Sequence, residues 1–418
     1  MEADEQASSG DVGSKPVVCF LGPISSYTHQ ATLETFPPDQ FDLMPVPTIK
    51  DIFDTTQSGA ATYGVVPFEN STNGSVVFTL DYFADRSGVY TDLNVCREIY
   101  LDVHHCLLGH IAPPSSSPPP PPSPPPHPSS LADTPSALAS KLTTALNSIE
   151  AEVDREASTS GQRTPTAQHP HPKEARSRPL HSISHVKRVY SHPQAFGQCT
   201  AFLGSWLRGV DAVDVSSTSR AAELALADPS GESAAVSSAV AAELLGLDVL
   251  ARNIEDRDDN KTRFFVLRRG VGDDAAAAAA STLTSLAKTK IRVVETEEEE
   301  ERDADDDDDD DAGILSNTKS LLSFTVPHSS PGALADVLSC FRRGGLNLTS
   351  INSRPSLAAA FEYIFFVEFG GHRFRDPRGR VVRVLDDVAA VARTSRWLGS
   401  WEDMRRKSPP PPPLLIES

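Results

Sequence analysis

The sequence predicts an open α/β protein with two lobes, followed by a smaller unit of the ferredoxin-like βαββαβ type. Short apolar runs alternate with helix-like segments over residues 17–108, and the same alternation returns over residues 186–267. Such alternation favours a layered α/β structure with a largely parallel sheet. The segment 321–401 has its own order of strand, helix, two strands, helix and strand, which is the ferredoxin-like order.

The expected elements are bounded by apolar runs and by the residues that interrupt them. Gly22-Pro23 ends the first run and Pro37-Pro38 ends the first helix-like segment, because proline continues neither element well. In the first lobe we expect strands at 17–21, 41–46 and 63–68, and helices at 27–36, 48–57 and 75–85. In the second lobe we expect strands at 186–190, 213–216, 234–237, 249–254 and 263–267, and helices at 195–207, 220–227 and 239–245. In the last unit we expect strands at 321–326, 347–353, 361–369 and 397–401, and helices at 333–343 and 381–392.

Two long stretches lack any periodic pattern. Proline and serine dominate residues 113–127, and we expect a disordered or polyproline insertion over residues 112–182. An alanine run and an acidic run fill residues 271–316, and residues 295–311 hold 14 acidic residues and one arginine. Charges of one sign at this density repel one another and stay solvated. The expected organisation is a first part of the two-lobed region at 17–111, the insertion at 112–182, a second part at 183–270, a linker at 271–316, the last unit at 317–403 and a disordered proline-rich tail at 404–418.

Composition narrows the class of protein. The formal net charge is −19, and the acidic run carries most of it, so the remainder is only mildly acidic. No basic patch points to nucleic acid as a partner. The five cysteines are scattered and never form a C-x-x-C pair, which is typical of reduced thiols in an intracellular protein. The acidic N-terminus has no apolar signal core and no apolar run reaches about 18 residues, so we expect a cytoplasmic protein that does not span a membrane.

Three strand-to-helix loops are the first candidates for a binding site. They are the segments 22–28, 69–75 and 216–220, each rich in small hydroxyl or amide side chains. Loops of this kind bring free backbone N–H groups and helix N-termini to the crevice at the carboxyl ends of strands. The alternative is ordinary helix capping by Ser, Thr and Asn.

Two further segments, 191–194 and 260–264, add an imidazole, amides and an arginine to the same kind of edge. Arg263 is either a carboxylate ligand or a surface cation at the start of a strand. His104-His105-Cys106 invites a metal-site interpretation. Adjacent strand residues point to opposite faces, however, and no remote ligands complete the set, so we expect no metal site. These observations predict a two-lobed binder of a small carboxylated ligand.

Four sequence blocks, taken in order, resemble the prephenate dehydratase family. They are Gly22-Pro23-Ile24-Ser25-Ser26-Tyr27-Thr28, Gly64-Val65-Val66-Pro67-Phe68-Glu69-Asn70-Ser71, Ser191-His192-Pro193-Gln194 followed by Gln198-Cys199, and Asn260-Lys261-Thr262-Arg263-Phe264. The first departs from the family pattern by Ser25 in place of glycine and Ser26 in place of threonine. The resemblance implies a bilobed catalytic domain of the type II periplasmic-binding-protein-like fold.

The last unit resembles the ACT regulatory domain. Pro331-Gly332-Ala333-Leu334 is similar to its Gly-Ala-Leu segment, and residues 347–355 are similar to its Asn-Leu-Thr…Glu-Ser-Arg-Pro segment, with Asn352 where family members carry glutamate. The resemblance implies that L-phenylalanine binds as an allosteric inhibitor and that the chain forms a homodimer or homotetramer through this domain. The effector-binding residues it implies are Gly332, Ala333, Leu334, Asn347, Leu348, Asn352, Ser353 and Arg354.

The resemblance also implies the reaction, prephenate to phenylpyruvate, water and carbon dioxide, in phenylalanine biosynthesis. Aromatisation drives this elimination, so no cofactor or metal is expected. Thr262 is expected to donate toward the leaving hydroxyl, and Asn70 and Gln194 to act with it in catalysis. The expected substrate-binding residues are Ser26, Tyr27, Thr28, Glu69, Ser71, Ser217, Thr218, Arg263 and Phe264.

Three alternatives remain open at the level of sequence. An arogenate dehydratase performs the same elimination on the transaminated substrate. A non-catalytic amino-acid sensor could use the same bilobed fold, although Thr262-Arg263-Phe264 argues against it. An interaction scaffold would make the proline and acidic runs the main function. No segment resembles a chorismate mutase domain, so we expect a monofunctional enzyme.

Overall fold

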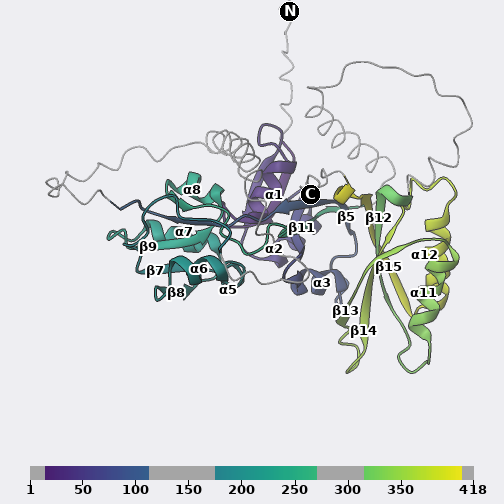
Figure 1. Cartoon of the computed structure of the whole chain (residues 1–418). Coiled ribbons are helices and arrows are strands. Elements are labelled where there is room, and N and C mark those ends of the chain that lie inside the picture. Colours follow the sequence, from purple (N-terminus) through teal and green to yellow (C-terminus); the bar gives the residue numbers. More distant parts are fainter. Residues whose placement is uncertain (1–14, 113–174, 271–314, 407–418) are drawn as a thin grey trace, which may run out of the picture.

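The computed structural model describes residues 15–112, 175–270 and 315–406 (Figure 1). Most of the predicted insertion, linker and tail lies outside these residues. The end of the predicted insertion lies within them and packs on the second lobe, where the Leu180 amide donates to the Leu250 carbonyl at 2.8 Å. Arg176 also lies 3.3 Å from the carboxylate of Asp258. The second lobe therefore begins earlier than the predicted boundary at residue 183.

The first lobe is built on a mixed sheet. Its strands are β1 (Val17–Leu21), β2 (Asp42–Val46), β3 (Tyr63–Asn70), β4 (Gly74–Ser75), β5 (Leu93–Asp102) and β11 (Lys261–Arg269). The order is β5-β11-β3-β1-β2, in which β1 runs parallel to β2 and β3 while β11 runs antiparallel to β3 and β5. The helices are α1 (Tyr27–Thr35), α2 (Ile49–Ser58) and α3 (Val77–Ala84). The strands and helices predicted for this lobe are confirmed, but β4 and β5 were not foreseen. The strand predicted at 263–267 in the second lobe belongs to this sheet as β11, where it pairs with β3 and β5.

The second lobe has its own five-stranded sheet. Its strands are β6 (Cys106–Gly109), β7 (Arg188–Ser191), β8 (Asp211–Asp214), β9 (Ser233–Ser237) and β10 (Asp248–Ala251), in the order β10-β6-β9-β7-β8. The helices are α5 (Pro193–Gly197), α6 (Thr200–Trp206), α7 (Thr218–Leu226) and α8 (Ala239–Leu245). The single helix predicted at 195–207 is wrong. Asp256 accepts from the Thr200 and Ala201 amides at 3.0 Å each, and so caps a new helix after the break.

The chain crosses between the two sheets at 103–105, from β5 to β6, and at 252–260, from β10 to β11. These crossings lie beside each other, because the Val103 amide donates to the Asn260 carbonyl at 2.8 Å. The last residues of β3 and the first residues of β11 lie at the same end of the first sheet, where Asn70 pairs with Thr262. The side chains that follow are gathered at this end, next to the crossings.

The C-terminal unit has the predicted βαββαβ order. It consists of β12 (Thr318–Thr325), α11 (Ala333–Arg343), β13 (Leu348–Pro355), β14 (Tyr363–Gly370), α12 (Arg380–Val391), β15 (Thr394–Glu402) and the short helix η1 (Met404–Arg406). Its strands follow the order β13-β14-β12-β15, with every neighbouring pair antiparallel. Figure 1 shows α11 and α12 together on one face of this sheet.

The C-terminal sheet continues the sheet of the first lobe. Gly399 of β15 pairs with Val95 of β5, and a Cβ at Gly399 would collide with the Val95 backbone. Behind this junction a shared hydrophobic cluster includes Phe265 and Phe68 from the first lobe and Trp401 and Phe366 from the C-terminal unit. Burying large aromatic side chains is the strongest packing contribution available. The C-terminal unit therefore packs against β11, the strand that carries Thr262, through contacts such as that of Trp401 with Phe265.

Candidate active site

Thr262 and Asn70 form the centre of the candidate site. The Asn70 amide nitrogen donates to the Thr262 hydroxyl oxygen at 3.0 Å and to the Asn260 side-chain oxygen at 2.9 Å. The Asn70 oxygen accepts from the backbone amides of Thr72 and Asn73 at 3.0 Å each. Because backbone N–H groups only donate, they fix which end of the Asn70 amide is the oxygen. The NH₂ end is thereby aimed at Thr262.

This geometry determines what the Thr262 hydroxyl can do. Its oxygen accepts a hydrogen bond from Asn70, and a hydroxyl that accepts still has its own proton to donate. Thr262 is only partly buried, whereas Asn260 beside it is 2% exposed. The Thr262 O–H is thus polarised by an amide donor and remains available to a bound molecule.

A chain of hydrogen bonds runs from this centre across both lobes. The Asn260 amide donates to the Gln198 side-chain oxygen at 3.0 Å. The same oxygen lies 2.7 Å from Nε2 of His105, and Nδ1 of His105 lies 2.8 Å from the Tyr27 hydroxyl. Amide, imidazole and phenol groups from four separate segments are thereby joined end to end.

The donor and acceptor roles along this chain follow from protonation states. Burial lowers the pKa of His105, so the ring is neutral near pH 7 and carries one N–H. The Gln198 oxygen only accepts, so Nε2 of His105 donates to it and Nδ1 accepts from the Tyr27 hydroxyl. Burial also raises the pKa of Tyr27 well above its ordinary value, which keeps the phenol protonated.

A buried carboxylate, Glu255, links the two crossings beneath this chain. It accepts from the His105 backbone amide at 2.8 Å and lies 3.0 Å from Nδ1 of His104. Burial opposes the charged form of His104, but the hydrogen bond to Glu255 and its negative charge outweigh this and raise the pKa of His104. The same partner lowers the pKa of Glu255 despite its burial. The histidines of the supposed metal segment are thus engaged in hydrogen bonds, and in the described part of the chain no group of three or more potential metal ligands gathers.

Some of the predicted loop residues cap helices, and others form hydrogen bonds between separate segments of the chain. Ser26 and Ser217 each accept from the backbone amide three residues on, and so cap α1 and α7. Thr28 is buried in the first turn of α1, and Thr218 is the first residue of α7. Ser71 instead connects segments, because its hydroxyl donates to the carbonyl oxygen of residue 259 at 3.1 Å and accepts from the amide of residue 261 at 3.0 Å. Ser26 and Ser217 are therefore ordinary helix caps, as the alternative interpretation of these loops predicted. Ser71 instead holds the beginning of β11, the strand that carries Thr262.

Gln194, one of the predicted catalytic residues, lies apart from this hydrogen-bond chain. Gln194 lies exposed at the start of α5, where its backbone amide donates to the His192 ring. Gln198, one turn further on, is the glutamine that contacts Asn260 and His105. The sequence contained Gln198 only as a continuation of the Ser-His-Pro-Gln block. Asn260, His105 and Gln198 are the site residues that sequence reasoning did not assign.

Arg263 and Phe264 do not contact this centre, which corrects their predicted role in substrate binding. Successive strand residues face opposite sides, and Arg263 points away from Thr262 into a buried ion cluster with Glu98 and Glu368, at 2.5 and 2.6 Å. Phe264 is 1% exposed and packs in the hydrophobic cluster of the first lobe. Glu69 is on the Arg263 side, 3.9 Å from its guanidinium, and is partly exposed.

The predicted effector residues lie at two ends of the C-terminal unit. Gly332, Ala333 and Leu334 open α11, while Asn347 and Leu348 stand at the beginning of β13 and Asn352, Ser353 and Arg354 near its end. Two of the last group face the first lobe. The Asn352 oxygen accepts from the Ser75 hydroxyl at 2.9 Å, and Arg354 binds both carboxylate oxygens of Asp81 at 2.9 Å each. This part of β13 is therefore docked on β4 and α3.

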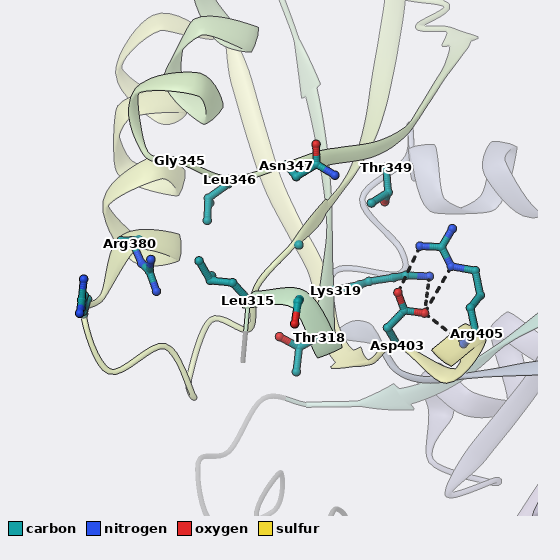
Figure 2. Close-up of a pocket in the computed structure, with 13 residues that line it drawn as sticks. Leu315, Thr318, Lys319, Gly345, Leu346, Asn347, Thr349, Arg380, Asp403 and Arg405 are labelled. Atoms are coloured by element: carbon teal, nitrogen blue, oxygen red, sulfur yellow. Dashed lines mark hydrogen bonds and ion pairs between the residues drawn. The ribbon is translucent and has the colours of Figure 1, made fainter. Parts of the chain in front are cut away.

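A cavity of about 540 Å³ opens at the beginning of β12 and β13. Its walls include Asn347, Thr349 and Lys319, with Arg380 on one side and Arg405 on the other (Figure 2). In Figure 2 the Lys319 ammonium and the Arg405 guanidinium both point to the Asp403 carboxylate, at 3.2 and 3.1 Å. Of the predicted effector residues, Asn347 alone lines this cavity.

None of the helices in the described ranges is long and apolar enough to cross a bilayer.

Fold and site together define a two-lobed α/β protein in which one hydrogen-bond chain joins side chains of both lobes to a threonine. Residues 18–115 and 175–271 match the family model described as prephenate dehydratase. A bifunctional chorismate mutase/prephenate dehydratase of Aquifex aeolicus is 29% identical over 92% of this chain and 73% of its own length. A probable prephenate dehydratase of Saccharomyces cerevisiae is 26% identical over 84% of this chain and 86% of its own.

Over the two segments that form its lobes, the chain is therefore similar to the prephenate dehydratase family. The fold agrees with that of a solved prephenate dehydratase of Arthrobacter aurescens in complex with L-Phe, with a TM-score of 0.59 and 22% identity over 93% of this chain and 91% of that one. The gap between the two matched segments, residues 116–174, falls within the predicted insertion.

Proposed function

We propose that this chain is a prephenate dehydratase, which converts prephenate to phenylpyruvate, carbon dioxide and water. The observation that carries the proposal is the hydrogen bond from the Asn70 amide to the Thr262 hydroxyl. It leaves the polarised Thr262 O–H available to donate to a bound molecule. The match of both lobe-forming segments to the prephenate dehydratase family model supports the same reaction.

The reaction requires one proton at one oxygen. Prephenate is a dianion, and the bond between its ring and its ring carboxylate breaks to release carbon dioxide. That electron pair enters the ring, which becomes aromatic as the C–O bond to the 4-hydroxyl breaks. The departing hydroxide takes a proton, so the reaction consumes one proton and releases water. Help of this general-acid type contributes about 10²–10⁴ in rate.

Thr262 is the proposed donor to that hydroxide. An aliphatic hydroxyl is a weak acid, and the negative charge that develops on its oxygen needs a donor at the position where Asn70 stands, 3.0 Å away. Asn260, Gln198 and His105 hold Asn70 from behind through the hydrogen-bond chain. Because these groups are held in place before substrate arrives, the site has little to reorganise during the reaction.

The second lobe is proposed to close over the substrate as in periplasmic-binding-like proteins. The two crossings at 103–105 and 252–260 are the segments about which such a movement would turn. The residues proposed to contact substrate are the partly buried Tyr27 and Thr262 and the exposed Ser71 near this boundary, with Gln198 in place of Gln194.

The C-terminal unit is proposed to be an ACT domain that binds L-phenylalanine and lowers activity. Its βαββαβ order supports this, as does the similar solved structure described in complex with L-Phe. Asn352 contacts Ser75, and Arg354 contacts Asp81, both in the first lobe. An effector that displaces β13 would therefore act on the segment that directly follows Asn70. We further propose a cytoplasmic homodimer or homotetramer assembled through this domain.

Purified protein should be incubated with prephenate while phenylpyruvate formation is followed, and the same assay repeated with arogenate and with added phenylalanine. Turnover of prephenate that phenylalanine suppresses is the expected result. Preference for arogenate would replace the substrate but keep the chemistry. A folded protein that turns over neither compound would contradict the proposal and favour a non-catalytic sensor.

A further inference from the structure

Four buried charged side chains form a closed ring between the first lobe and the C-terminal unit. Arg263 and Glu98 come from β11 and β5, and Lys319 and Glu368 come from β12 and β14. The Arg263 guanidinium lies 2.5 Å from the Glu98 carboxylate and 2.6 Å from that of Glu368. The Lys319 ammonium lies 3.2 and 3.4 Å from the same two carboxylates. Positive and negative groups thus alternate around the ring.

The ring is almost closed to solvent. Arg263 is 6% exposed, and Glu98, Lys319 and Glu368 are between 0 and 2% exposed. Isolated charges are very costly to bury, whereas paired and hydrogen-bonded charges are tolerated. Burial alone would lower the pKa of Arg263, but the Glu368 and Glu98 carboxylates raise it, so the guanidinium stays charged. Each member therefore depends on the others for its charge to be compensated.

The ring acts on the strand that carries Thr262. Arg263 is the next residue along β11, and its guanidinium carbon lies 4.8 Å from the ring centre of Phe265 and 5.4 Å from that of Phe68. The pairing of β11 with β3 shifts register immediately after Arg263. Bulges of this kind direct side chains near active sites. Thr262 and Arg263 face opposite sides of one strand, so the backbone cannot tilt Thr262 without moving Arg263 within the ring.

Glu368 is the member through which the C-terminal unit takes part. One of its carboxylate oxygens accepts a hydrogen bond from the Arg263 guanidinium, and the other accepts one from the Thr349 hydroxyl at 3.0 Å. Thr349 lies on β13 and lines the cavity shown in Figure 2, as does Lys319. The hydrogen bond from Thr349 in the C-terminal sheet thereby orients the Glu368 carboxylate, and this carboxylate compensates the charge of Arg263 in the first lobe.

We infer that Glu368 is a positioning residue for the active site: it holds Arg263, and through Arg263 it fixes the direction of the Thr262 hydroxyl. The inference rests on the proposed function. If Glu368 positions Thr262, the C-terminal unit supports the active site directly, in addition to its proposed role in regulation. The prediction from sequence that Arg263 binds a substrate carboxylate is replaced by binding to a carboxylate of the protein itself.

The test uses three variants of the full chain. Glu368→Gln keeps the shape of the side chain and removes its charge. The double variant Lys319→Met with Glu368→Gln removes one charge of each sign. It leaves Arg263 paired with Glu98, and Asp403, which loses Lys319, paired with Arg405. Glu362→Gln is the matched control, because Glu362 precedes β14 and pairs with Arg393 in a partly exposed salt bridge.

We expect Glu368→Gln to lower kcat at least tenfold with KM within about threefold of the unchanged protein, and to lower Tm. The double variant should recover most of the Tm but keep the low kcat, because Arg263 still lacks its second carboxylate. Glu362→Gln should match the unchanged protein in both. Recovery of kcat together with Tm in the double variant would show a merely structural role and overturn the inference, as would a folded Glu368→Gln with normal kcat.

Hydrogen exchange provides a readout that does not depend on turnover. Amides of residues 261–264 should exchange faster in Glu368→Gln and in the double variant, and at the unchanged rate in Glu362→Gln. Equal protection in all three would contradict the inference whatever the activity shows. If the unchanged protein has no dehydratase activity while exchange responds as expected, the proposed function fails and the positioning of Thr262 by Glu368 stands.

Discussion

Replacing Asn70 by aspartate is the sharpest perturbation of the proposed mechanism. The change keeps an oxygen for the backbone amides of Thr72 and Asn73, which lie 3.0 Å from the Asn70 oxygen. It removes the NH₂ group that donates to Thr262 and to Asn260. The Thr262 hydroxyl then turns to donate to the new carboxylate, and its proton is withdrawn from the substrate.

The size of the effect follows from the contacts that are lost. Loss of one donor that acts on charge developing in the transition state costs about 10²–10³ in kcat. Loss of the partner of the buried Asn260 oxygen lowers stability by about 1–3 kcal/mol. We therefore expect Asn70→Asp to remain folded, with kcat reduced at least a hundredfold and a smaller change in KM.

The assay compares Asn70→Asp with Asn73→Asp by phenylpyruvate formation and thermal unfolding. Asn73 is exposed in the same loop, so this control adds the same charge close by without touching Thr262. It should retain activity within about threefold, because exposed substitutions have small effects. A value of kcat for Asn70→Asp within fivefold of the unchanged protein would refute the role given to the Asn70 amide.

Two further predictions concern the supporting residues. Gln198→Ala should lower kcat at least tenfold, since it leaves Asn260 and His105 without their shared acceptor, while Gln194→Ala should be nearly normal. The reverse ranking in steady-state assays would restore the assignment made from sequence. The raised pKa of His104 beside Glu255 contributes stability that is fully present below the ordinary histidine pKa and is lost as pH rises through the folded value. Urea unfolding between pH 6 and 8 should therefore show a smaller loss of stability in His104→Gln than in the unchanged protein, and equal pH dependence would contradict the pairing.

Features encoded by neighbouring residues were predictable from the sequence. Ser26 and Ser217 precede helices and cap them through amides three residues on, and Thr48 forms the capping box with Asp51. The βαββαβ order of the C-terminal unit was also visible, since apolar periodicity and turn residues define it locally. Asn70 and Thr262 each stand in a distinctive sequence block, and the structure joins them in one hydrogen bond. Their roles in catalysis stay a prediction.

Features that depend on distant partners were not predictable. Strand β5 was overlooked because charged residues interrupt its apolar pattern, and Glu98 within it is fully buried. Its partners are Arg263 and Lys319, which no local pattern connects to it. Arg263 was misassigned for the same reason, since its carboxylate Glu368 lies 105 residues further along the chain. The positions of Gln198 and Gln194 differ because the helix is interrupted between α5 and α6. Asp256, 56 residues after Thr200, caps the start of α6, and no local pattern indicates this.

The most direct test of the account is the activity of Thr262→Ala beside Thr262→Ser. Both remove the methyl group, and only serine keeps the hydroxyl, so the comparison isolates the proton donor. The account predicts that Thr262→Ala loses at least a hundredfold in kcat for prephenate while its Tm stays close to that of the unchanged protein, and that Thr262→Ser retains most of the activity. Near-normal turnover by a folded Thr262→Ala would contradict the central claim and require another donor for the leaving hydroxide.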